Sequence, residues 1–446
     1  MLTTAMTTRG AVRGQAEGGV VVFRGVPYAS CARFSRPEPT TAWEGERDAT
    51  TDGPIAPQWP SRMDSMLGIH GYHEQSEDCL YLTITTPTVD GPVRPVIVWL
   101  HGGGWVSGAG SLKCYGGHRL ANEGNVVVVS VNYRLGMLGY LRSPGVSDGN
   151  LGLADQLAAL RWVRDNIAAF GGDPDAVTVA GQSAGAHSVQ CLIGMPESRG
   201  LFHRAIIQSS PAGLGLGSAR TANRSGARFL ALLGASPTTA PLSAVLDAQA
   251  EVGRLSGRGF GLGLSTGVTP VPGIPPMPSK ALWSAEVTKR APSLDILMGS
   301  TAREAAAFFA QHPNMLRLRR IPVLGPTVAA GIEQAISSVV FTRPIRRLAQ
   351  RLSRAGARVW AYRIDYAAPA TLFGAAHGIE LPFLLGADSD WVGAEMLAGA
   401  DPKDVESLGR RLRAAWLSFI HTGDPNTDGD WSRFTARSPT LRHWDA

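Results

Sequence analysis

The chain has few cysteines, and their positions fit neither a metal site nor a disulfide framework. Four cysteines occur in 446 residues, and no two of them lie close together: Cys31, Cys79, Cys114 and Cys191. Zinc sites typically use cysteine or histidine pairs a few residues apart, and small disulfide-stabilised domains contain many more cysteines. The sequence therefore predicts free thiols in a reducing compartment, and we expect a cytoplasmic protein.

Long apolar segments are also lacking. No run approaches the roughly 18 apolar residues that a membrane span needs, and the first ten residues lack the apolar core of a signal peptide. Charge blocks and low-complexity tracts are absent, while 44% hydrophobic and 17% charged residues are ordinary for a globular protein. Because no linker divides the chain, we expect one domain over residues 1–446 and no membrane span.

The net charge of +6 comes largely from arginines that are spread along the chain. Within residues 343–358, arginines alternate with apolar residues at helical spacing, which is typical of the solvated face of an amphipathic helix. A nucleic-acid surface would need a more concentrated basic face. We therefore expect no nucleic-acid partner, and the sequence gives no indication of the oligomeric state.

Strand and helix signals alternate through most of the chain. Continuous apolar runs at 95–100 and 126–133 predict strands covered on both faces, and apolar residues three and four apart predict a helix over 151–170. Further strands are expected at 17–28, 80–86, 204–209, 294–298 and 359–364, a late helix at 406–421, and an irregular segment at 255–280. This alternation predicts an α/β fold with a large, mostly parallel sheet, and a site at the carboxyl ends of its strands.

The pattern Gly-x-Ser-x-Gly occurs three times, centred on Ser147, Ser183 and Ser265. Chance matches are expected in a chain with 53 glycines, so the context must decide between them. Around Ser183 a turn at Asp173-Pro174 is followed by an apolar approach at 177–180, and residues suited to a buried helix come afterwards. Ser147 and Ser265 lack such flanks and are interpreted as loops. Ser183 is therefore the candidate nucleophile at a strand–turn–helix elbow.

A run of glycines follows the predicted strand at 95–100. Residues 101–105 read His-Gly-Gly-Gly-Trp, and consecutive glycines allow backbone N–H groups to face a ligand without steric hindrance. We expect Gly103 and Gly104 to donate to an oxyanion, together with Ala184 at the start of the helix after the nucleophile, where the helix dipole favours negative charge. Trp105 either lines the acyl pocket or packs in the core.

A serine nucleophile also needs a histidine base and an acid that orients it. In hydrolase chain order the acid comes between Ser183 and the base, and His377 lies in a loop that suits the base. Glu304 follows a predicted strand within that interval, and Asp295 and Asp365 are rivals. The pattern alone leaves the acid open among the three.

Metal chemistry has little support in the sequence. The cluster at 70–74 and the pair His377 and Glu380 have spacings that a metal tolerates, but no third ligand is evident for either. We therefore expect neither a metal nor another cofactor.

Short segments over nearly the whole chain occur in the same order in one known family. They are Phe23–Ala29, Arg33-Phe34, Ser76–Leu82, His101–Trp105, Val131–Gly136, Gly181–Ala186, Leu201-Phe202 with Gln208-Ser209, and Thr422–Asn426. In these segments the chain resembles the bacterial type B carboxylesterases, in the cholinesterase-like branch of the α/β-hydrolases. The resemblance implies an α/β-hydrolase fold whose loop and helical insertions form a substrate gorge, and a serine carboxylesterase that acts on a small-molecule ester.

The resemblance also implies a role for each candidate residue. The family's acid segment corresponds to residues 299–305 and keeps Glu304, although both neighbours of the glutamate differ, and its histidine segment matches residues 377–381. Ser183 would attack the ester carbonyl and form an acyl-enzyme, His377 would transfer the proton, and Glu304 would orient His377. Ser209 corresponds to a buried family serine near the acid, or is simply a satisfied core hydroxyl.

The resemblance to the family also extends to residues with a structural role. The family's bracing ion pairs correspond to Arg33 with Glu77, and Arg134 with Asp155. Cys79 matches a cysteine that is disulfide-bonded in secreted members, but Ala56 stands at the partner position, so no bridge is expected. Two alternatives to ester hydrolysis remain: the acyl-enzyme could be consumed by an amine, an alcohol or lactone formation, or the chain could be a non-catalytic binding protein, which the intact catalytic residues disfavour.

Overall fold

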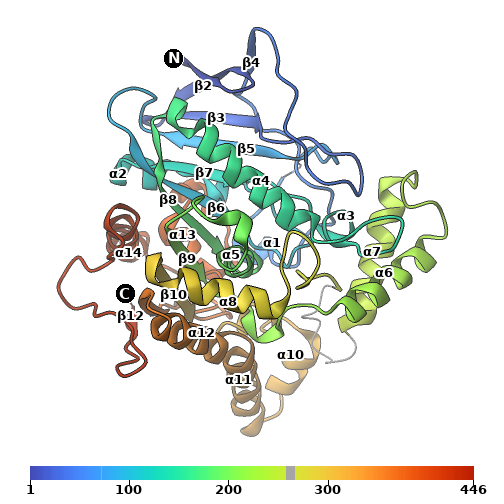
Figure 1. Ribbon diagram of the computed structural model, residues 1–446. Coiled ribbons are helices and arrows are strands. Elements are labelled where there is room, and N and C mark those ends of the chain that lie inside the picture. The colour runs from blue at the N-terminus through green and yellow to red at the C-terminus, as the bar shows by residue number, and fades with distance from the viewer. Residues whose placement is uncertain (72, 258–266, 446) are drawn as a thin grey trace.

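The computed structural model describes residues 1–71, 73–257 and 267–445, which fold around one large twisted sheet (Figure 1). Its strands lie in the order β1-β2-β3-β5-β7-β6-β8-β9-β10-β11-β12, and β4 pairs with β2. They are β1 (Leu2–Thr7), β2 (Gly10–Glu17), β3 (Val20–Pro27), β4 (Glu46–Asp48), β5 (Tyr81–Thr86), β6 (Arg94–Leu100), β7 (Val127–Val131), β8 (Gly172–Gln182), β9 (Arg204–Gln208), β10 (Asp295–Thr301), β11 (Arg358–Ile364) and β12 (Arg442–Trp444). Every pairing from β7 through β6 to β12 is parallel, whereas β1, β2, β3, β5 and β7 pair antiparallel.

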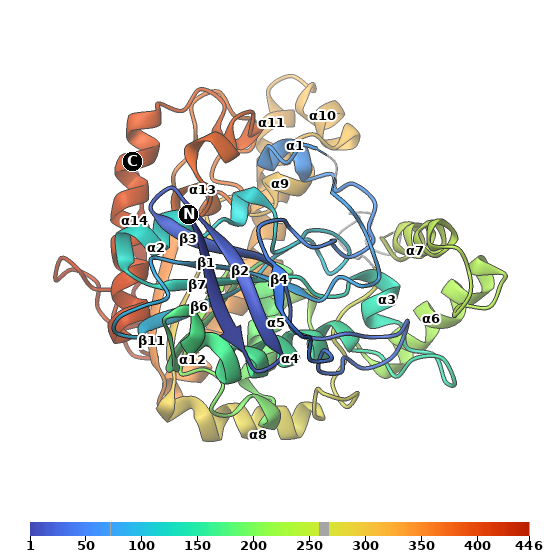
Figure 2. The same ribbon diagram turned by 90° about the horizontal axis from the view of Figure 1, so that it is seen from above.

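Helices cover both faces of the sheet (Figures 1 and 2). They are α1 (Asp64–Leu67), α2 (His118–Gly124), α3 (Gly136–Tyr140), α4 (Leu151–Asn166), α5 (Ala184–Ile193), α6 (Ala219–Leu233), α7 (Leu242–Gly257), α8 (Lys280–Arg290), α9 (Ala306–Phe309), α10 (Pro313–Arg319), α11 (Leu324–Ser337), α12 (Arg343–Arg354), α13 (Leu381–Leu384) and α14 (Pro402–Thr422). One layer contains α4, α5, α8 and α12, and the other contains α2, α13 and α14. Helices α6 and α7 pack on each other as an arm beside the main body.

The alternation of side chains along β6 explains the two layers. Val96, Val98 and Leu100 belong to the core beneath α4, whereas Ile97 and Trp99 belong to the core beneath α14. Successive residues of a strand point to opposite faces, so a strand between two helical layers must be apolar at every position. The continuous apolar run that predicted this strand is therefore the consequence of its central place in the sheet.

The predicted fold class is confirmed, and most predicted elements appear within a few residues of their expected bounds. The helix expected at 151–170 is α4 followed by a 3₁₀ turn, η2 (Ile167–Phe170), and Gly171 ends it with a φ of 75°. The turn expected at Asp173-Pro174 lies inside β8: Gly172 pairs with Arg94, the register then shifts before Val177, and the Asp173 carboxylate accepts the backbone N–H of Asp175 at 2.9 Å.

The irregular segment expected at 255–280 is only partly correct. Helix α7 continues to Gly257, residues 267–279 form neither helix nor strand, and α8 begins at Lys280. The rest of that segment, including the motif centred on Ser265, lies outside the described residues. The single-domain organisation stays a prediction.

An insertion between β10 and β11 contains a long apolar helical run. Helices α11 and α12, joined by the π-helical turn η7 (Ser338–Thr342), form a continuous helix over Leu324–Arg354, with 31 residues and a mean hydropathy of 1.2 in its most apolar window. By length and composition this helix could cross a membrane, which the sequence analysis did not foresee, because Pro326, Gly331 and Glu333 interrupt the apolar run. One such helix, a third of whose window is buried in the fold, is weak evidence for a span.

Candidate active site

Ser183 lies at a sharp turn between β8 and α5. Its backbone has a φ of 55° and a ψ of −121°, and its side chain is partly exposed whereas both neighbours are buried. A positive φ is unusual for a residue with a side chain and marks stored backbone strain, as expected at a nucleophile elbow. Gly185 is required for packing, since a Cβ there would lie 2.0 Å from the Leu100 carbonyl oxygen. Ser147, by contrast, is buried in a loop, as predicted.

The glycine loop after β6 lies against this elbow. Gly103 and Gly104 have φ angles of 107° and 62°, which glycine adopts without strain. The Gly103 carbonyl oxygen accepts hydrogen bonds from the backbone N–H groups of Val106 and Ser107, both at 3.1 Å, so the loop has a fixed shape. A Cβ at the preceding Gly102 would lie 3.1 Å from the Ser183 Cβ, which places the loop beside the nucleophile.

Ala184 is the first residue of α5. The first N–H groups of a helix have no partner within the helix, and the helix dipole gives that end partial positive charge. The glycine loop and the start of α5 thus both adjoin Ser183, and the role of Gly103, Gly104 and Ala184 as oxyanion donors stays a prediction.

The base and acid candidates form a buried hydrogen-bonded pair. The Nδ1 atom of His377 lies 2.6 Å from the Glu304 Oε2 atom, and the Oε1 atom accepts the backbone N–H of Thr301 at 2.8 Å. The two loops are joined where Arg303 donates its backbone N–H to the Ala375 carbonyl at 2.9 Å. This backbone hydrogen bond between the loops, together with the burial of Glu304 and His377, fixes the orientation of the imidazole ring.

The rival acids make other contacts. Asp295 pairs with Arg358, and Asp365 pairs with Arg363 and with His443. Of the three carboxylates that the sequence left open, Glu304 is the one that contacts His377.

Gln182 also contacts the histidine, which the sequence analysis missed. Its side-chain nitrogen lies 3.0 Å from the His377 Nε2 atom. Because Nδ1–H donates to Glu304, the neutral imidazole has its lone pair at Nε2, where it accepts an N–H of the Gln182 amide. Two aromatic rings also lie close to the imidazole. The ring centroids of Phe308 and Phe341 are 5.3 and 5.0 Å from that of His377.

A second buried carboxyl group lies behind the acid. Glu380 is fully buried, and its Oε1 atom accepts a hydrogen bond from the Ser209 hydroxyl at 3.5 Å. Burial, and next the charge of Glu304, raise the pKa of Glu380 to about 7. Ser209 thus lies near the acid, as expected, but its partner is Glu380. The sequence analysis considered Glu380 only as a metal ligand, and the described residues contain no group of three metal-ligating side chains.

Two other histidines lie close to the site. Burial lowers the pKa of both His101 and His187 to about 4, so both are neutral near pH 7. The ring of His187 lies 5.5 Å from that of Trp105, and the Trp105 side chain is buried in a cluster with Phe229. Trp105 therefore packs in the core, and its role in an acyl pocket stays a prediction.

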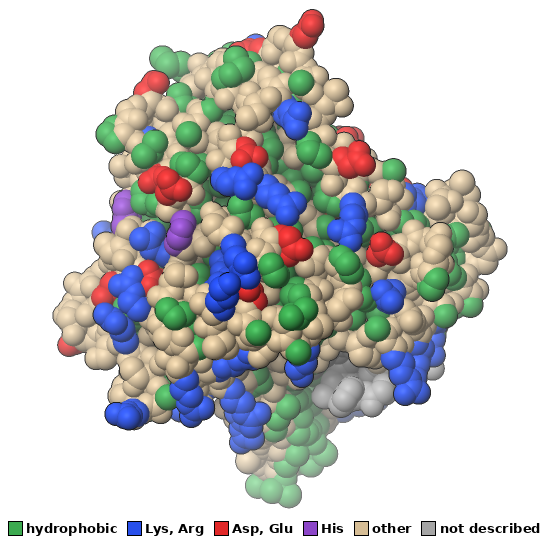
Figure 3. Space-filling view, in the orientation of Figure 1, with side chains coloured by type: hydrophobic (Ala, Val, Ile, Leu, Met, Phe, Trp, Pro, Cys, Tyr) green, Lys and Arg blue, Asp and Glu red, His purple; other side chains and the backbone are tan. Residues whose placement is uncertain are grey.

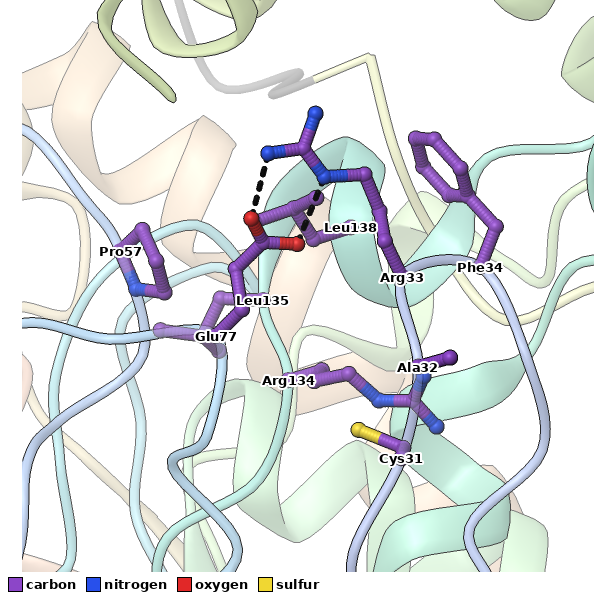
Figure 4. A pocket seen from close by; sticks show the side chains of 9 residues that line it. All are labelled: Cys31, Ala32, Arg33, Phe34, Pro57, Glu77, Arg134, Leu135 and Leu138. Atoms are coloured by element: carbon purple, nitrogen blue, oxygen red, sulfur yellow. Dashed lines mark hydrogen bonds and ion pairs between the residues drawn. The ribbon is translucent and has the colours of Figure 1, made fainter. Parts of the chain in front are cut away.

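The predicted bracing ion pairs are confirmed. Arg33 Nε lies 2.7 Å from Glu77 Oε2, and Arg134 forms a fully buried pair with Asp155 at 2.7 Å. Figure 4 shows the Arg33–Glu77 pair beside a small cavity of about 10 Å³, which is too small for an ester substrate. Cys31 lines this cavity, and all four cysteines are free thiols.

Known proteins similar to this chain share its fold and nearly its whole length. The sequence model of the carboxylesterase family matches residues 2–317 and 325–445. A probable N-octanoylanthranilate hydrolase of Rhodococcus erythropolis is 45% identical over 95% of this chain and 94% of its own length. The para-nitrobenzyl esterase of Bacillus subtilis (strain 168) is 35% identical over 96% of this chain and 92% of its own.

The solved structures agree. The structure of a thermophilic PNB esterase superimposes with a TM-score of 0.85 at 33% identity, and covers 99% of this chain and 96% of its own. A carboxylesterase structure from Geobacillus stearothermophilus gives a TM-score of 0.83 at 32% identity, with the same coverage. The chain thus belongs to the carboxylesterase family of α/β-hydrolases, as a bacterial type B carboxylesterase that hydrolyses esters of carboxylic acids.

Proposed function

We propose that Ser183, His377 and Glu304 act as a catalytic triad and that hydrolysis proceeds through an acyl-enzyme on Ser183. The observation that carries the proposal is the 2.6 Å contact between Glu304 and His377, whose Nε2 atom lies 3.0 Å from the side chain of Gln182, the residue before the strained Ser183. Acyl transfer through serine needs a nucleophile, a base, an orienting acid and oxyanion donors, and candidates for all four lie together here.

The first step is attack of the Ser183 hydroxyl on the ester carbonyl carbon. His377 takes the hydroxyl proton at Nε2, after this atom exchanges its contact with Gln182 for one with Ser183, and returns the proton to the departing alkoxide. Water then attacks the acyl-enzyme with His377 again as the base, which releases the carboxylic acid and restores Ser183.

Charge develops at two points, and each has a fixed partner. The imidazolium of His377 is stabilised by the Glu304 carboxylate, which Thr301 holds through its backbone N–H. The oxyanion is bound by the N–H groups of Gly103, Gly104 and Ala184. Preorganised donors of this kind are worth about 10²–10³-fold in kcat each.

Medium-chain acyl derivatives of aromatic amines are the substrate class that we propose beside simple esters. The probable N-octanoylanthranilate hydrolase is 45% identical along almost the whole chain, and its name describes an acyl group on an aromatic amine. A triad that forms an acyl-enzyme from an ester can also form one from an amide, provided that His377 protonates the leaving nitrogen.

Hydrolysis of p-nitrophenyl octanoate and of N-octanoylanthranilate tests the two substrate classes with one acyl group. We expect Ser183→Ala to lower kcat by at least about 10⁴-fold with either compound, and Glu304→Gln to lower it by about 10²–10⁴-fold. A Ser183→Ala protein as active as the wild type would overturn the triad. A wild-type protein that hydrolyses the ester but not the amide would restrict the function to esters.

Competing acceptors test the alternative fate of the acyl group. If an added amine or alcohol captures the octanoyl group in place of water, the activity is acyl transfer. If octanoic acid is the sole product at every acceptor concentration, the activity is hydrolysis. A fluorophosphonate probe that fails to label Ser183 would instead support a non-catalytic binding protein.

A further inference from the structure

The insertion between β10 and β11 exposes an unusual number of large apolar side chains. Seven of them lie within 24 residues, on α10, on the turn that follows it and along α11 and η7: Leu316, Ile321, Val323, Leu324, Val328, Ile332 and Val339. Val323 is 88% exposed and Leu324 is 68% exposed. Single exposed apolar residues are ordinary, but a contiguous group marks an interaction site. We call this group of seven side chains the apolar patch.

The patch occupies the outward face of α11, whose inward face is already packed. Leu324, Val328 and Ile332 recur every four residues and share one face of the helix, whereas Ala329 and Ser337 are buried against the fold. A surface helix normally turns polar residues outward. Figure 3 shows hydrophobic side chains gathered at the tip of the molecule that α11 forms in Figure 1, with basic side chains nearby.

The segment that contains the patch, together with α12, is strongly basic. Residues 312–354 contain eight arginines and a single acidic residue, whereas the rest of the chain contains 34 basic and 35 acidic residues. The acidic residue, Glu333, is buried and paired with Arg303 and Arg319. The exposed arginines of this segment are Arg317, Arg320, Arg343, Arg346, Arg347 and Arg354. The formal excess charge of the protein therefore resides in the segment that contains the patch and α12.

We propose that the apolar patch docks on an anionic lipid bilayer, with its leucine, isoleucine and valine side chains at the acyl chains and the arginines at the phosphate headgroups. An apolar face rimmed by arginine is the pattern of helices that lie in a membrane interface. The charge argues against a second copy of this chain as the occupant, because a symmetric interface would place the same arginines opposite each other.

Crossing the bilayer is excluded for the folded protein by the inward face of the same helical run. Ile345 and Leu352 of α12 pack in the core beneath the sheet, and Glu333 is fixed by its two arginines. The helix Leu324–Arg354 can therefore contact lipid only through its outward face.

The docked face belongs to the insertion that also covers the catalytic histidine. Phe341 of η7 packs on His377, and Ser337 at the end of α11 accepts the backbone N–H of Ala305, next to Glu304, at 2.9 Å. Docking would therefore hold the site at the interface, where apolar esters concentrate. Residues 318–324, which include part of the patch, lie between the two ranges that match the family model.

Vesicle flotation tests the proposal with the full chain. We expect binding to vesicles of phosphatidylcholine and phosphatidylglycerol in equal parts to exceed binding to phosphatidylcholine alone by at least about tenfold, because one arginine at an anionic surface gives about a fivefold gain. High salt should abolish this preference. Equal or absent binding to the two kinds of vesicle would overturn the proposal.

Paired substitutions locate the docking face. Val323→Ser with Leu324→Ser should weaken binding by at least about tenfold, since two large apolar side chains no longer leave water. Leu282→Ser with Val392→Ser is the matched control, because these side chains are 64% and 73% exposed on other elements. If both pairs bind as the wild type does, the patch is not the docking face.

The arginines are tested in the same way. Arg317→Gln with Arg320→Gln should remove most of the preference for phosphatidylglycerol, whereas Arg220→Gln with Arg224→Gln, two exposed arginines of α6, should not. Equal loss from both pairs would show a general effect of net charge and would overturn the assignment to this face.

Three further measurements separate the outcomes. Unchanged hydrolysis of a soluble short-chain ester shows that the Val323 and Leu324 variants are folded. Ser183→Ala should bind vesicles as the wild type does, so loss of the triad and loss of docking are distinguishable. A dimer that Val323→Ser with Leu324→Ser dissociates would identify a second copy as the occupant and overturn lipid docking.

Discussion

Glu380→Gln should change how the stability of the protein depends on pH. The Glu380 carboxyl is fully buried, and burial together with the nearby charge of Glu304 raises its pKa from 4.5 to about 7. The folded protein thus binds this proton more tightly than the unfolded chain does. A group of this kind contributes full stability below its unfolded pKa of about 4.5, and the contribution is lost as the pH rises through 7.

The size of the effect follows from the shift. One pKa unit corresponds to about 1.4 kcal/mol, so the ionisation of Glu380 should lower the free energy of unfolding by about 3 kcal/mol between pH 4.5 and pH 8. Glutamine has the same shape and can still accept the Ser209 hydroxyl, but it does not ionise. The variant should therefore gain stability relative to the wild type as the pH rises.

Chemical denaturation at a series of pH values measures this difference. The free energy of unfolding of Glu380→Gln minus that of the wild type should rise by about 3 kcal/mol from pH 4.5 to pH 8. Glu44→Gln, which removes an exposed carboxylate, serves as the control for general charge effects. A difference that stays flat across this range would refute the reasoning, because the wild-type carboxyl would then cost nothing to ionise in the fold.

Two further substitutions test the contacts around the nucleophile. Gln182→Glu replaces the amide that lies 3.0 Å from the His377 Nε2 atom with a carboxylate that stabilises the imidazolium. The acid limb of the pH profile of kcat/KM should therefore move up by about 1–3 units, and an unmoved limb would contradict the assignment of the base. Gly103→Ala places a Cβ 2.0 Å from the Ser107 carbonyl oxygen at a φ of 107°, so the loop must shift. We expect kcat to fall by about 10²–10³-fold, whereas Gly215→Ala, at another positive φ but with no neighbour within 4 Å, should leave kcat unchanged.

The sequence alone supported the central sheet and the nucleophile because both have local signatures. A strand between two helical layers is apolar at every position, and the turn at Ser183 needs glycine two positions before and two positions after the serine. The acid was less accessible, since residues 299–305 resemble the family segment only at its glycine and glutamate. Local pattern placed Glu304 after a predicted strand but left Asp295 and Asp365 as rivals, and the hydrogen bond to His377 is a contact between segments 73 residues apart.

Contacts of this long-range kind also explain what the sequence analysis missed. Gln182 is in the elbow motif at a position that the motif leaves free, and Glu380 was visible only as a residue three positions after His377. Their chemistry depends on burial and on which atoms face the imidazole, and neither follows from spacing. The pKa of Glu380 is raised to about 7 because the fold buries its carboxyl group beside Glu304, which the sequence motif does not indicate.

The outer face of α11 is another feature that the sequence pattern does not reveal. Its apolar residues recur at helical spacing on two faces, so periodicity predicts a helix but does not say which face packs in the core. In the fold, Ala329 and Ser337 are buried, and the buried Glu333 pairs with two arginines. The side chains of Leu324, Val328 and Ile332 are exposed to water. Leaving such side chains exposed brings no stability to the folded protein, and the exposed arginines of the same segment repel one another. A surface that is unfavourable in both respects is best explained by an anionic, apolar partner that relieves both.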